Sequence, residues 1–238
     1  VVAQYDMSYA DGYLTDISGN ENHAKLQGIT DGDFAEDEGS KVLNLGDKKY
    51  VELPAGMIEK EKFEIEAEFK IGADNKENSW LFTLGSKVDK WPNVKNYLFF
   101  CPEQTGNGNN ANKGNLRAGI KDANNEVLLA QGAKAVADAY NTVKVAFDNG
   151  TISVYLNGAL VESADTGYSI QKILADGTDG KIAGYIGKSL YSPDPAFTGS
   201  LKSFKVSAVR KDHSDEGKVA EAKEALSLPY NTTDKQVY

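Results

Sequence analysis

Strict alternation of apolar and polar residues is the feature that most constrains the fold of this chain. The longest such run covers residues 63–71, where glutamates at 64, 66 and 68 and a lysine at 70 separate Phe63, Ile65, Ala67, Phe69 and Ile71. Successive side chains of a β-strand point to opposite faces, so a strand buries the apolar set and leaves the carboxylates in water. A helix would scatter those carboxylates around its circumference. The pattern recurs at 142–147 and 151–156 and predicts a β-rich protein.

Short turn sequences connect these strands. Asp148-Asn149-Gly150 separates two of them and tolerates positive φ, so the pair reads as a β-hairpin. Asn157-Gly158 then turns the chain into a third strand, which gives an antiparallel meander. Helical turns are expected at 54–58 and 169–174. The other predicted strands are 1–5, 24–27, 41–45, 50–53, 80–84, 97–101, 116–120, 126–130, 182–187 and 201–208.

More than ten short strands without intervening helices predict two packed antiparallel sheets, because each strand has one apolar face to bury. A jelly-roll sandwich over residues 1–209 is the natural all-β architecture. The chain then changes character. Residues 214–228 predict a short helix that Ser214 caps and Pro229 ends. We interpret residues 210–238 as a helical linker leading to a next module.

Charge narrows the range of partners. The chain has 26 Lys and Arg against 35 Asp and Glu, a formal net charge of -9. This balance disfavours nucleic acid and anionic membrane surfaces, which select basic proteins, and it suits a neutral partner or a bound cation. No stretch predicts membrane insertion, and no signal peptide opens the chain. The single cysteine, Cys101, has no disulfide partner and is expected to be a small buried side chain on a strand.

The order of motifs along residues 1–208 resembles that of bacterial laminin-G-like, concanavalin A-like jelly rolls. An N-terminal strand precedes a D-x-S-G-N-x-N turn at residues 16–22. A Y-L-N-G hairpin follows at 155–158, and the strand after Phe197 closes the pattern. No single motif is specific, whereas their order is. The resemblance implies the same sandwich fold.

Two segments, 87–97 and 184–197, are similar to laminin-G-like modules of multimodular bacterial glycosidases, notably of the arabinofuranosidase-associated type. That resemblance implies a non-catalytic carbohydrate-binding module that directs a parent glycoside hydrolase to a polysaccharide, with arabinan or galactan favoured. It also implies a secreted or cell-surface location, an oligo- or polysaccharide partner, and a monomer within a longer chain. The alternative is a structural spacer or protein-interaction domain of a bacterial cell-surface protein.

The turn at residues 16–22 is a candidate calcium site, because Asp16, Asn20, Asn22 and the Gly19 carbonyl concentrate oxygen ligands. The family often holds a structural calcium here, joined by an acidic residue near the last strand. This chain has Lys202-Ser203 at that place, and Asp6 could compensate. The alternative is an asparagine-rich turn whose side chains cap backbone groups.

Sugar binding requires exposed aromatic rings flanked by polar groups. Trp91 is the best candidate, since it lies in a polar, proline-containing loop, and Tyr191 in a second such loop is next. Candidate hydrogen-bonding residues are Lys87, Asn93, Asn96, Lys188 and Asp194. Trp80 alternates with Phe82 and Leu84 and is expected in the core. Tyr155 could face a concave sheet surface or solvent.

Evidence for catalysis is thin. Glycoside hydrolysis needs two carboxylates across a cleft, and the glutamates at 64, 66 and 68 read instead as one solvated strand face. His23 and His213 are the only histidines, and His23 lies in the turn motif without an evident nucleophile. We therefore expect that this module is not an enzyme.

Overall fold

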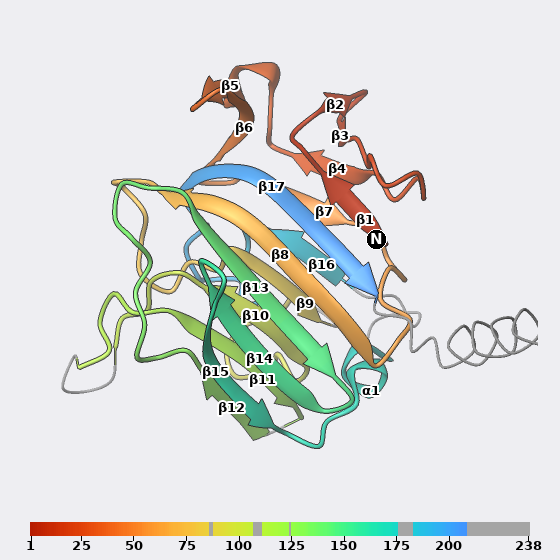
Figure 1. The fold of residues 1–238 in the computed structure, drawn as a ribbon, viewed down its shortest axis with the longest axis vertical. Coiled ribbons are helices and arrows are strands. Elements are labelled where there is room, and N and C mark those ends of the chain that lie inside the picture. Colours follow the sequence, from red (N-terminus) through yellow and green to blue (C-terminus); the bar gives the residue numbers. More distant parts are fainter. Residues whose placement is uncertain (86–87, 107–110, 124, 176–182, 209–238) are drawn as a thin grey trace, which may run out of the picture. The chain divides into compact units, whose positions relative to one another are not determined.

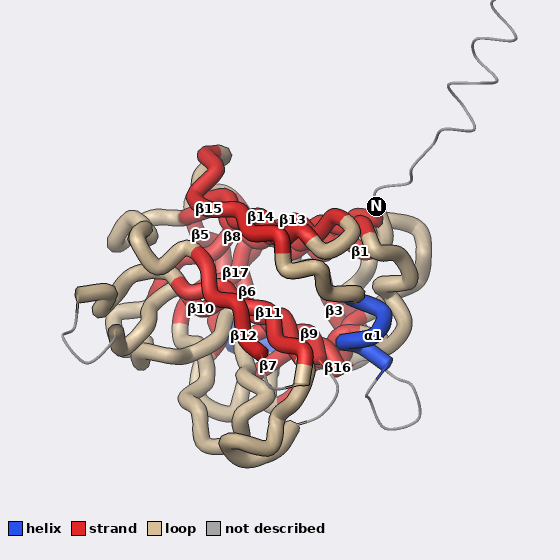
Figure 2. Tube along the Cα trace, turned by 90° about the horizontal axis from the view of Figure 1, so that it is seen from below, coloured by secondary structure: helices blue, strands red, loops and turns tan. Residues whose placement is uncertain are grey.

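The computed structural model describes residues 1–85, 88–106, 111–123, 125–175 and 183–208. Its strands form two layers, visible edge-on in Figure 2. The named strands pair antiparallel throughout the described residues, which confirms the predicted two-sheet sandwich. Beyond one 3-10 turn (Asp31–Asp33), the described part has one helix, α1 (Ile170–Ala175), at the edge of the sandwich (Figure 1). No helix among the described residues is long and apolar enough to cross a membrane.

The first sheet is built around the alternating strand β8, with its C-terminal neighbour β17 on one side and the predicted meander on the other. β1 (Ala3–Tyr5) pairs with β17 outside the main order. The sheet order is β15 (Ala159–Asp165), β14 (Thr151–Leu156), β13 (Asn141–Asp148), β8 (Lys62–Ile71), β17 (Gly199–Ala208), β6 (Ser40–Leu45) and β5 (Phe34–Asp37).

The second sheet carries the candidate site on its outer side. In this sheet a late strand, β16, inserts between two earlier ones, β9 and β7. The sheet order is β12 (Asn125–Leu129), β11 (Arg117–Asp122), β10 (Tyr97–Cys101), β9 (Phe82–Gly85), β16 (Ala183–Ile186), β7 (Tyr50–Leu53), β4 (Ala24–Gln27), β3 (Tyr13–Leu14) and β2 (Tyr9–Ala10).

The main core lies between the sheets, and β8 shows why the sequence forms it. Phe63, Ile65, Ala67 and Phe69 are buried there, as the alternation predicts. The intervening glutamates face outward and form ion pairs with lysines. The Nζ–Oε1 distances are 3.7, 3.3 and 3.2 Å in the pairs Lys144–Glu64, Lys205–Glu66 and Lys202–Glu68. Such exposed ion pairs contribute little to stability. The row is a solvated strand face, as expected.

Most local predictions are confirmed. The Asp148–Thr151 and Leu156–Ala159 pairings close the two predicted hairpins, and β10 has the predicted bounds. The helical turn predicted at 54–58 is wrong: these residues make a turn without helix. Strands β2, β3 and β5 were not predicted: β2 and β3 have two residues each, too few to show alternation, and β5 has a single large apolar residue, Phe34. The predicted helix at 214–228 lies outside the described residues.

A second apolar cluster covers the outer face of β10. Tyr97, Phe99 and Cys101 point away from the main core, and Trp80 stacks on Phe99 with ring centroids 4.0 Å apart. Trp80 is therefore buried, as predicted, although it packs in this outer cluster rather than beside Phe82 and Leu84. Cys101 is the expected buried thiol, and burial raises its pKa to about 12.

Candidate functional site

The two loops singled out from the sequence lie side by side. Asp89 forms an isolated parallel bridge with Tyr191. The Asp89 N–H donates to the Leu190 carbonyl (3.0 Å), and the Ser192 N–H donates to the Asp89 carbonyl (2.9 Å). The loop that carries Trp91 is thus hydrogen-bonded to the loop that carries Tyr191, although about a hundred residues separate them in the sequence.

A half-open pocket of about 280 Å³ lies against the second of these loops. Three predicted residues line it: Lys188, Tyr191 and Asp194. Other lining residues come from the turn before β7 and from the same loop, namely Asp47, Lys48, Tyr50, Gly187, Ser189, Ser192, Pro195 and Ala196. The sequence reasoning missed the turn residues. They reach the loop through the long-range pairing of β7 with β16, in which Val51 faces Ile186, and no local sequence signal indicates that pairing.

Lys188 is held over two aromatic rings at the pocket. Its ammonium nitrogen lies 4.2 Å from the ring centroid of Tyr50 and 4.7 Å from that of Tyr185. The two rings themselves meet edge-on, with centroids 5.5 Å apart. Cation–π attraction restricts where the lysine can lie. It presents a positioned hydrogen-bond donor to the pocket.

Asp194 is held by its own loop. Its Oδ2 accepts a hydrogen bond from the Ser189 hydroxyl (2.7 Å), whose oxygen in turn accepts the Tyr191 N–H (3.0 Å). Burial raises the pKa of Asp194 above its usual value, against the opposing influence of the Ser189 hydrogen bond and of the Arg117 charge. The carboxyl group is a fixed acceptor in a partly desolvated wall.

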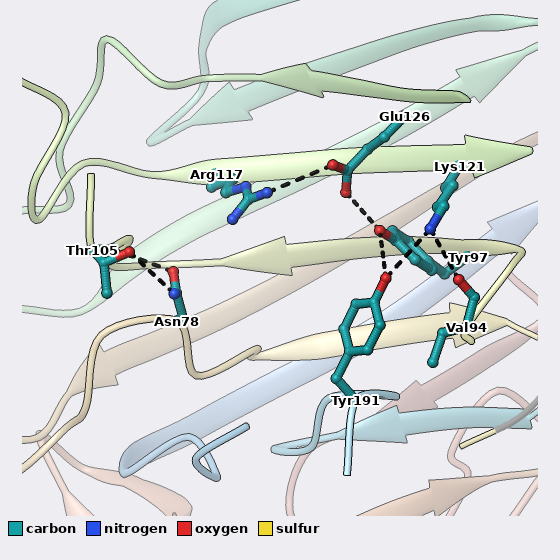
Figure 3. A network of polar contacts seen from close by, with 8 residues as sticks. All are labelled: Asn78, Val94, Tyr97, Thr105, Arg117, Lys121, Glu126 and Tyr191. Atoms are coloured by element: carbon teal, nitrogen blue, oxygen red, sulfur yellow. Dashed lines mark hydrogen bonds and ion pairs between the residues drawn. The ribbon is translucent and has the colours of Figure 1, made fainter. Parts of the chain in front are cut away.

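Tyr191 is fixed at both its ring and its hydroxyl. The ring packs edge-on against Trp80 and Tyr97, with both centroid separations at 5.8 Å. Figure 3 shows a chain of polar contacts from Lys121 through Tyr191 and Tyr97 to Glu126. The Tyr97 hydroxyl donates a hydrogen bond to Glu126 (2.7 Å). Its oxygen therefore accepts the hydrogen bond of the Tyr191 hydroxyl, and the Tyr191 oxygen accepts one from Lys121 (3.4 Å).

The groups around these hydrogen bonds favour the same assignment of donors and acceptors. Burial and the carboxylate of Glu126 raise the pKa of Tyr97 far above its usual value, so Tyr97 stays protonated and keeps donating. Arg117 lies 3.6 Å from Glu126, and Lys121 also donates to the Val94 carbonyl (3.0 Å; Figure 3). The pocket wall at Tyr191 is therefore preorganised.

The remaining predicted sugar-site residues do not line the pocket. The Trp91 side chain is 75% exposed, and Asn93 two residues later is also exposed. Asn96 is buried and its Oδ1 accepts the Ala123 N–H (2.8 Å), which is a structural contact. Lys87 lies outside the described residues. Tyr155 is half-buried on β14 of the other sheet, with Lys144 over its ring at 4.3 Å.

The predicted calcium turn has a full set of internal hydrogen bonds. Asp16 accepts the N–H groups of Gln4, Ser18 and Asn22 (2.9 Å each) and the Ser18 hydroxyl (2.8 Å). Burial alone would raise the pKa of Asp16, but these hydrogen bonds outweigh it and hold that pKa below its usual value. Both carboxylate oxygens are occupied by donors, which matches the backbone-capping alternative.

The other predicted calcium ligands belong to the same capped arrangement. The amide groups of Asn20 and Asn22 donate to the Val2 carbonyl (3.1 and 2.8 Å). Asp6 accepts the Ser8 N–H (3.0 Å) in a turn of its own. Over the described residues, no group of three or more His, Cys, Asp and Glu side chains could hold a metal ion. Calcium at Asp16, Gly19, Asn20 and Asn22 stays a prediction.

Comparison with known proteins adds a family match and several similar folds. The family model described as the concanavalin A-like lectin/glucanases superfamily matches residues 45–212. No curated protein matches the sequence. Domain 4 of the extracellular GH43 arabinanase AbnA from Geobacillus stearothermophilus, solved with arabinotriose, aligns at a TM-score of 0.66 and 17% identity. The alignment covers 87% of this chain and 91% of that domain.

Two larger carbohydrate-active enzymes contain a similar fold. Trypanosoma rangeli sialidase aligns at a TM-score of 0.58 and 13% identity, over 95% of this chain and 33% of its own. An arabinofuranosidase solved with arabinofuranosyl-xylobiose aligns at 0.51 and 13%, over 88% and 49%. The chain therefore spans about half or less of these two proteins. At such identities the likeness establishes the fold.

Proposed function

Since the chain belongs to the concanavalin A-like lectin/glucanases superfamily, we propose that it binds carbohydrate, in the pocket beside Tyr191. The observation that carries the proposal is the composition of this pocket. It joins aromatic side chains, Tyr50 and Tyr191, to fixed polar groups on Lys188 and Asp194. Sugars offer apolar C–H faces and hydroxyl groups that both donate and accept, so they need this combination.

The charges of the pocket favour a neutral sugar. Two carboxylates, Asp47 and Asp194, are balanced by two ammonium groups, Lys48 and Lys188. A strongly acidic glycan would also meet the overall net charge of -9. Ammonium donors and carboxylate acceptors in one pocket suit hydroxyl groups, which both donate and accept.

Arabinan or galactan is the substrate class that we favour, with the module acting by tethering. The arabinanase domain of similar fold was solved with arabinotriose, and it supports this choice. A non-catalytic module joined to a glycoside hydrolase would raise the local concentration of polysaccharide around the catalytic domain. The proposal includes a monomer in a multimodular, extracellular protein.

Affinity electrophoresis in gels that contain arabinan, galactan or arabinogalactan tests the function. We expect retardation of the wild type in at least one gel and loss of retardation in Lys188→Met, which keeps the apolar stem but removes the donor. Lys144→Met is the matched control, because Lys144 lies over the ring of Tyr155 at 4.3 Å in the other sheet. Absence of wild-type retardation in every gel contradicts the proposal.

A second candidate function, glycoside hydrolysis, is favoured by one observation: two carboxylates, Asp47 and Asp194, line the same pocket. The raised pKa of Asp194 is the property that a general acid needs. Its hydrogen bond from Ser189 ties that carboxyl group to its own loop instead. Release of reducing sugar from the retained polysaccharide, abolished in both Asp47→Asn and Asp194→Asn, would establish hydrolysis over binding alone.

A further inference from the structure

We propose that the binding surface continues from the pocket onto Trp91, so that the module recognises an oligosaccharide of several units rather than one sugar. This inference rests on the proposed function and deepens it. The pocket would hold one unit of the chain, and the Trp91 ring would contact a later unit. Trp91 is a specificity residue for chain length in this arrangement.

The first observation is the exposure of the ring. At 75%, Trp91 is the most exposed large hydrophobic residue among the described residues. Its neighbours Lys90, Pro92 and Asn93 are exposed as well, so this part of the loop faces solvent. A single exposed hydrophobic residue is ordinary in a soluble protein, and exposure alone assigns no role.

The second observation is a direct connection to the pocket. Ser192 lines the pocket, and its N–H donates to the carbonyl of Asp89, two residues before Trp91. The Asp89–Tyr191 bridge sets those two backbones about 5 Å apart. Two further residues extend at most about 7 Å, so the Cα of Trp91 lies within about 12 Å of that of Tyr191.

A separation of at most about 12 Å allows the pocket and the Trp91 ring to contact different units of one oligosaccharide. Trp91 does not line the pocket, so a unit seated between Tyr191 and Lys188 does not require it. The ring is nonetheless close enough for a chain that leaves the pocket past Ser192. Asn93, on the same exposed loop, offers an amide to the hydroxyl groups of that outer unit.

The loops are also braced, which makes Trp91 a usable platform. The Asn93 N–H donates to the Lys90 carbonyl (2.7 Å), and the Asp194 N–H donates to the Tyr191 carbonyl (3.0 Å). Each loop thus closes a turn of its own and is joined to the other through Asp89. Binding to ordered loops loses less conformational entropy than binding to free ones.

Isothermal titration calorimetry with oligosaccharides of one to five units tests the inference. The series is arabinose-based, or galactose-based when galactan is the polymer that retains the wild type. For the wild type we expect affinity to rise with length until the ligand reaches Trp91. Trp91→Ala should leave the affinity for the single sugar unchanged and weaken binding of the longer oligosaccharides roughly tenfold, the effect of removing a partly covered ring.

Matched variants separate this result from a loss of fold. Leu160→Ala removes a 57% exposed side chain from the other sheet and should change no affinity, while Trp91→Phe should recover part of the loss. If Trp91→Ala changes the affinity equally at every ligand length, or at none, the inference is overturned. Lys188→Met still tests the pocket independently of that result. A wild type that binds no sugar overturns the proposed function itself.

Discussion

The hydroxyl groups of Tyr97 and Tyr191 lie 3.3 Å apart and join strand β10 to a loop 94 residues further along the chain. Tyr97 is buried in the outer cluster, whereas Tyr191 lines the pocket. Through this contact the polar chain that begins at Glu126 fixes the orientation of a pocket wall. The stability of the outer cluster and the shape of the pocket are therefore linked.

Tyr97→Phe removes that link and keeps the ring. The Tyr191 hydroxyl then loses its hydrogen-bond acceptor, and Glu126 loses the hydrogen bond from Tyr97. We expect the free energy of unfolding to fall by about 1 kcal/mol, which lowers the melting temperature by about 2–4 °C. Sugar affinity should fall severalfold, measured by calorimetry. Tyr168→Phe, which removes a long hydrogen bond to the Asn125 carbonyl (3.3 Å), is the control. Equal behaviour of the two variants would contradict the role of Tyr97.

Gly119→Ala tests how closely β11 approaches the outer cluster. A Cβ at this position would lie 2.4 Å from Cε1 of Phe99 and 3.0 Å from Cδ2 of Leu128. Phe99 stacks on Trp80, so the ring cannot move without disturbing the packing around Tyr191. We expect a loss of about 1–3 kcal/mol in chemical denaturation.

The control for this substitution is Gly132→Ala. Nothing lies within 4 Å of the Cβ position of Gly132, so that variant should unfold at the denaturant concentration of the wild type or above. Similar denaturation midpoints for the two alanine variants would show that the outer cluster accommodates the added methyl group without loss of stability.

Asp16→Asn tests the capped turn and predicts its pH dependence. The native carboxylate accepts three N–H groups and one hydroxyl, so we expect a loss of about 2–3 kcal/mol at neutral pH. The folded state lowers the pKa of Asp16, so its contribution is complete above the ordinary value and is lost as pH falls through the lowered one.

The difference between wild type and Asp16→Asn should therefore shrink as the pH falls through the lowered pKa, which chemical denaturation at a series of pH values from neutral downward would show. Asp6→Asn serves as the comparison, because that exposed carboxylate accepts a single N–H from Ser8. A gap between wild type and Asp16→Asn that stays the same at every pH down to the acid unfolding of the wild type, with no narrowing as Asp16 protonates, would contradict the ionised carboxylate as its cause.

Calcium at the same turn remains a prediction. The Val1 and Val2 carbonyl oxygens already lie within 3.1 Å of the amide groups of Asn20 and Asn22. Rotation of those amides would turn their oxygens toward the carbonyls, and a cation could then bind between them. We expect chelation to lower the melting temperature and added calcium to restore it, with a weaker response in Asn22→Ala. A melting temperature that ignores both chelator and calcium would leave hydrogen bonding as the whole explanation.

Local pattern made much of the fold predictable. β8, β13 and β14 alternate over six or more residues, so each was recognisable as a strand. The turns at Asn149-Gly150 and Asn157-Gly158 also determined the pairing of β13 with β14 and of β14 with β15, whereas the pairing of β8 with β13 spans more than seventy residues. The 54–58 turn was misjudged as helical because a short apolar stretch after a proline carries little periodicity.

The candidate site was predictable only in part. Tyr191, Lys188 and Asp194 were found because one polar, proline-containing loop carries all three. Tyr50, Asp47 and Lys48 were missed, since their place in the pocket depends on β7 pairing with β16 more than a hundred residues away. Trp91 was the first sugar-binding candidate from the sequence; the structure brings its loop beside that of Tyr191 but keeps Trp91 off the pocket lining.

The placement of β16 and β17 has a consequence for how the chain reaches this structure. Each inserts between strands made much earlier, β16 between β9 and β7 and β17 between β8 and β6. Until residue 186 has left the ribosome both layers lack an interior strand, and until residue 208 has left it the first sheet still lacks β17, so that β8 and β6 expose unpaired backbone along their facing edges. Folding must then wait for the last strand, and the high sequence separation of its contacts makes it slow. A nascent chain that stops just before β17 would expose unpaired strand edges, and we expect chaperones to bind it.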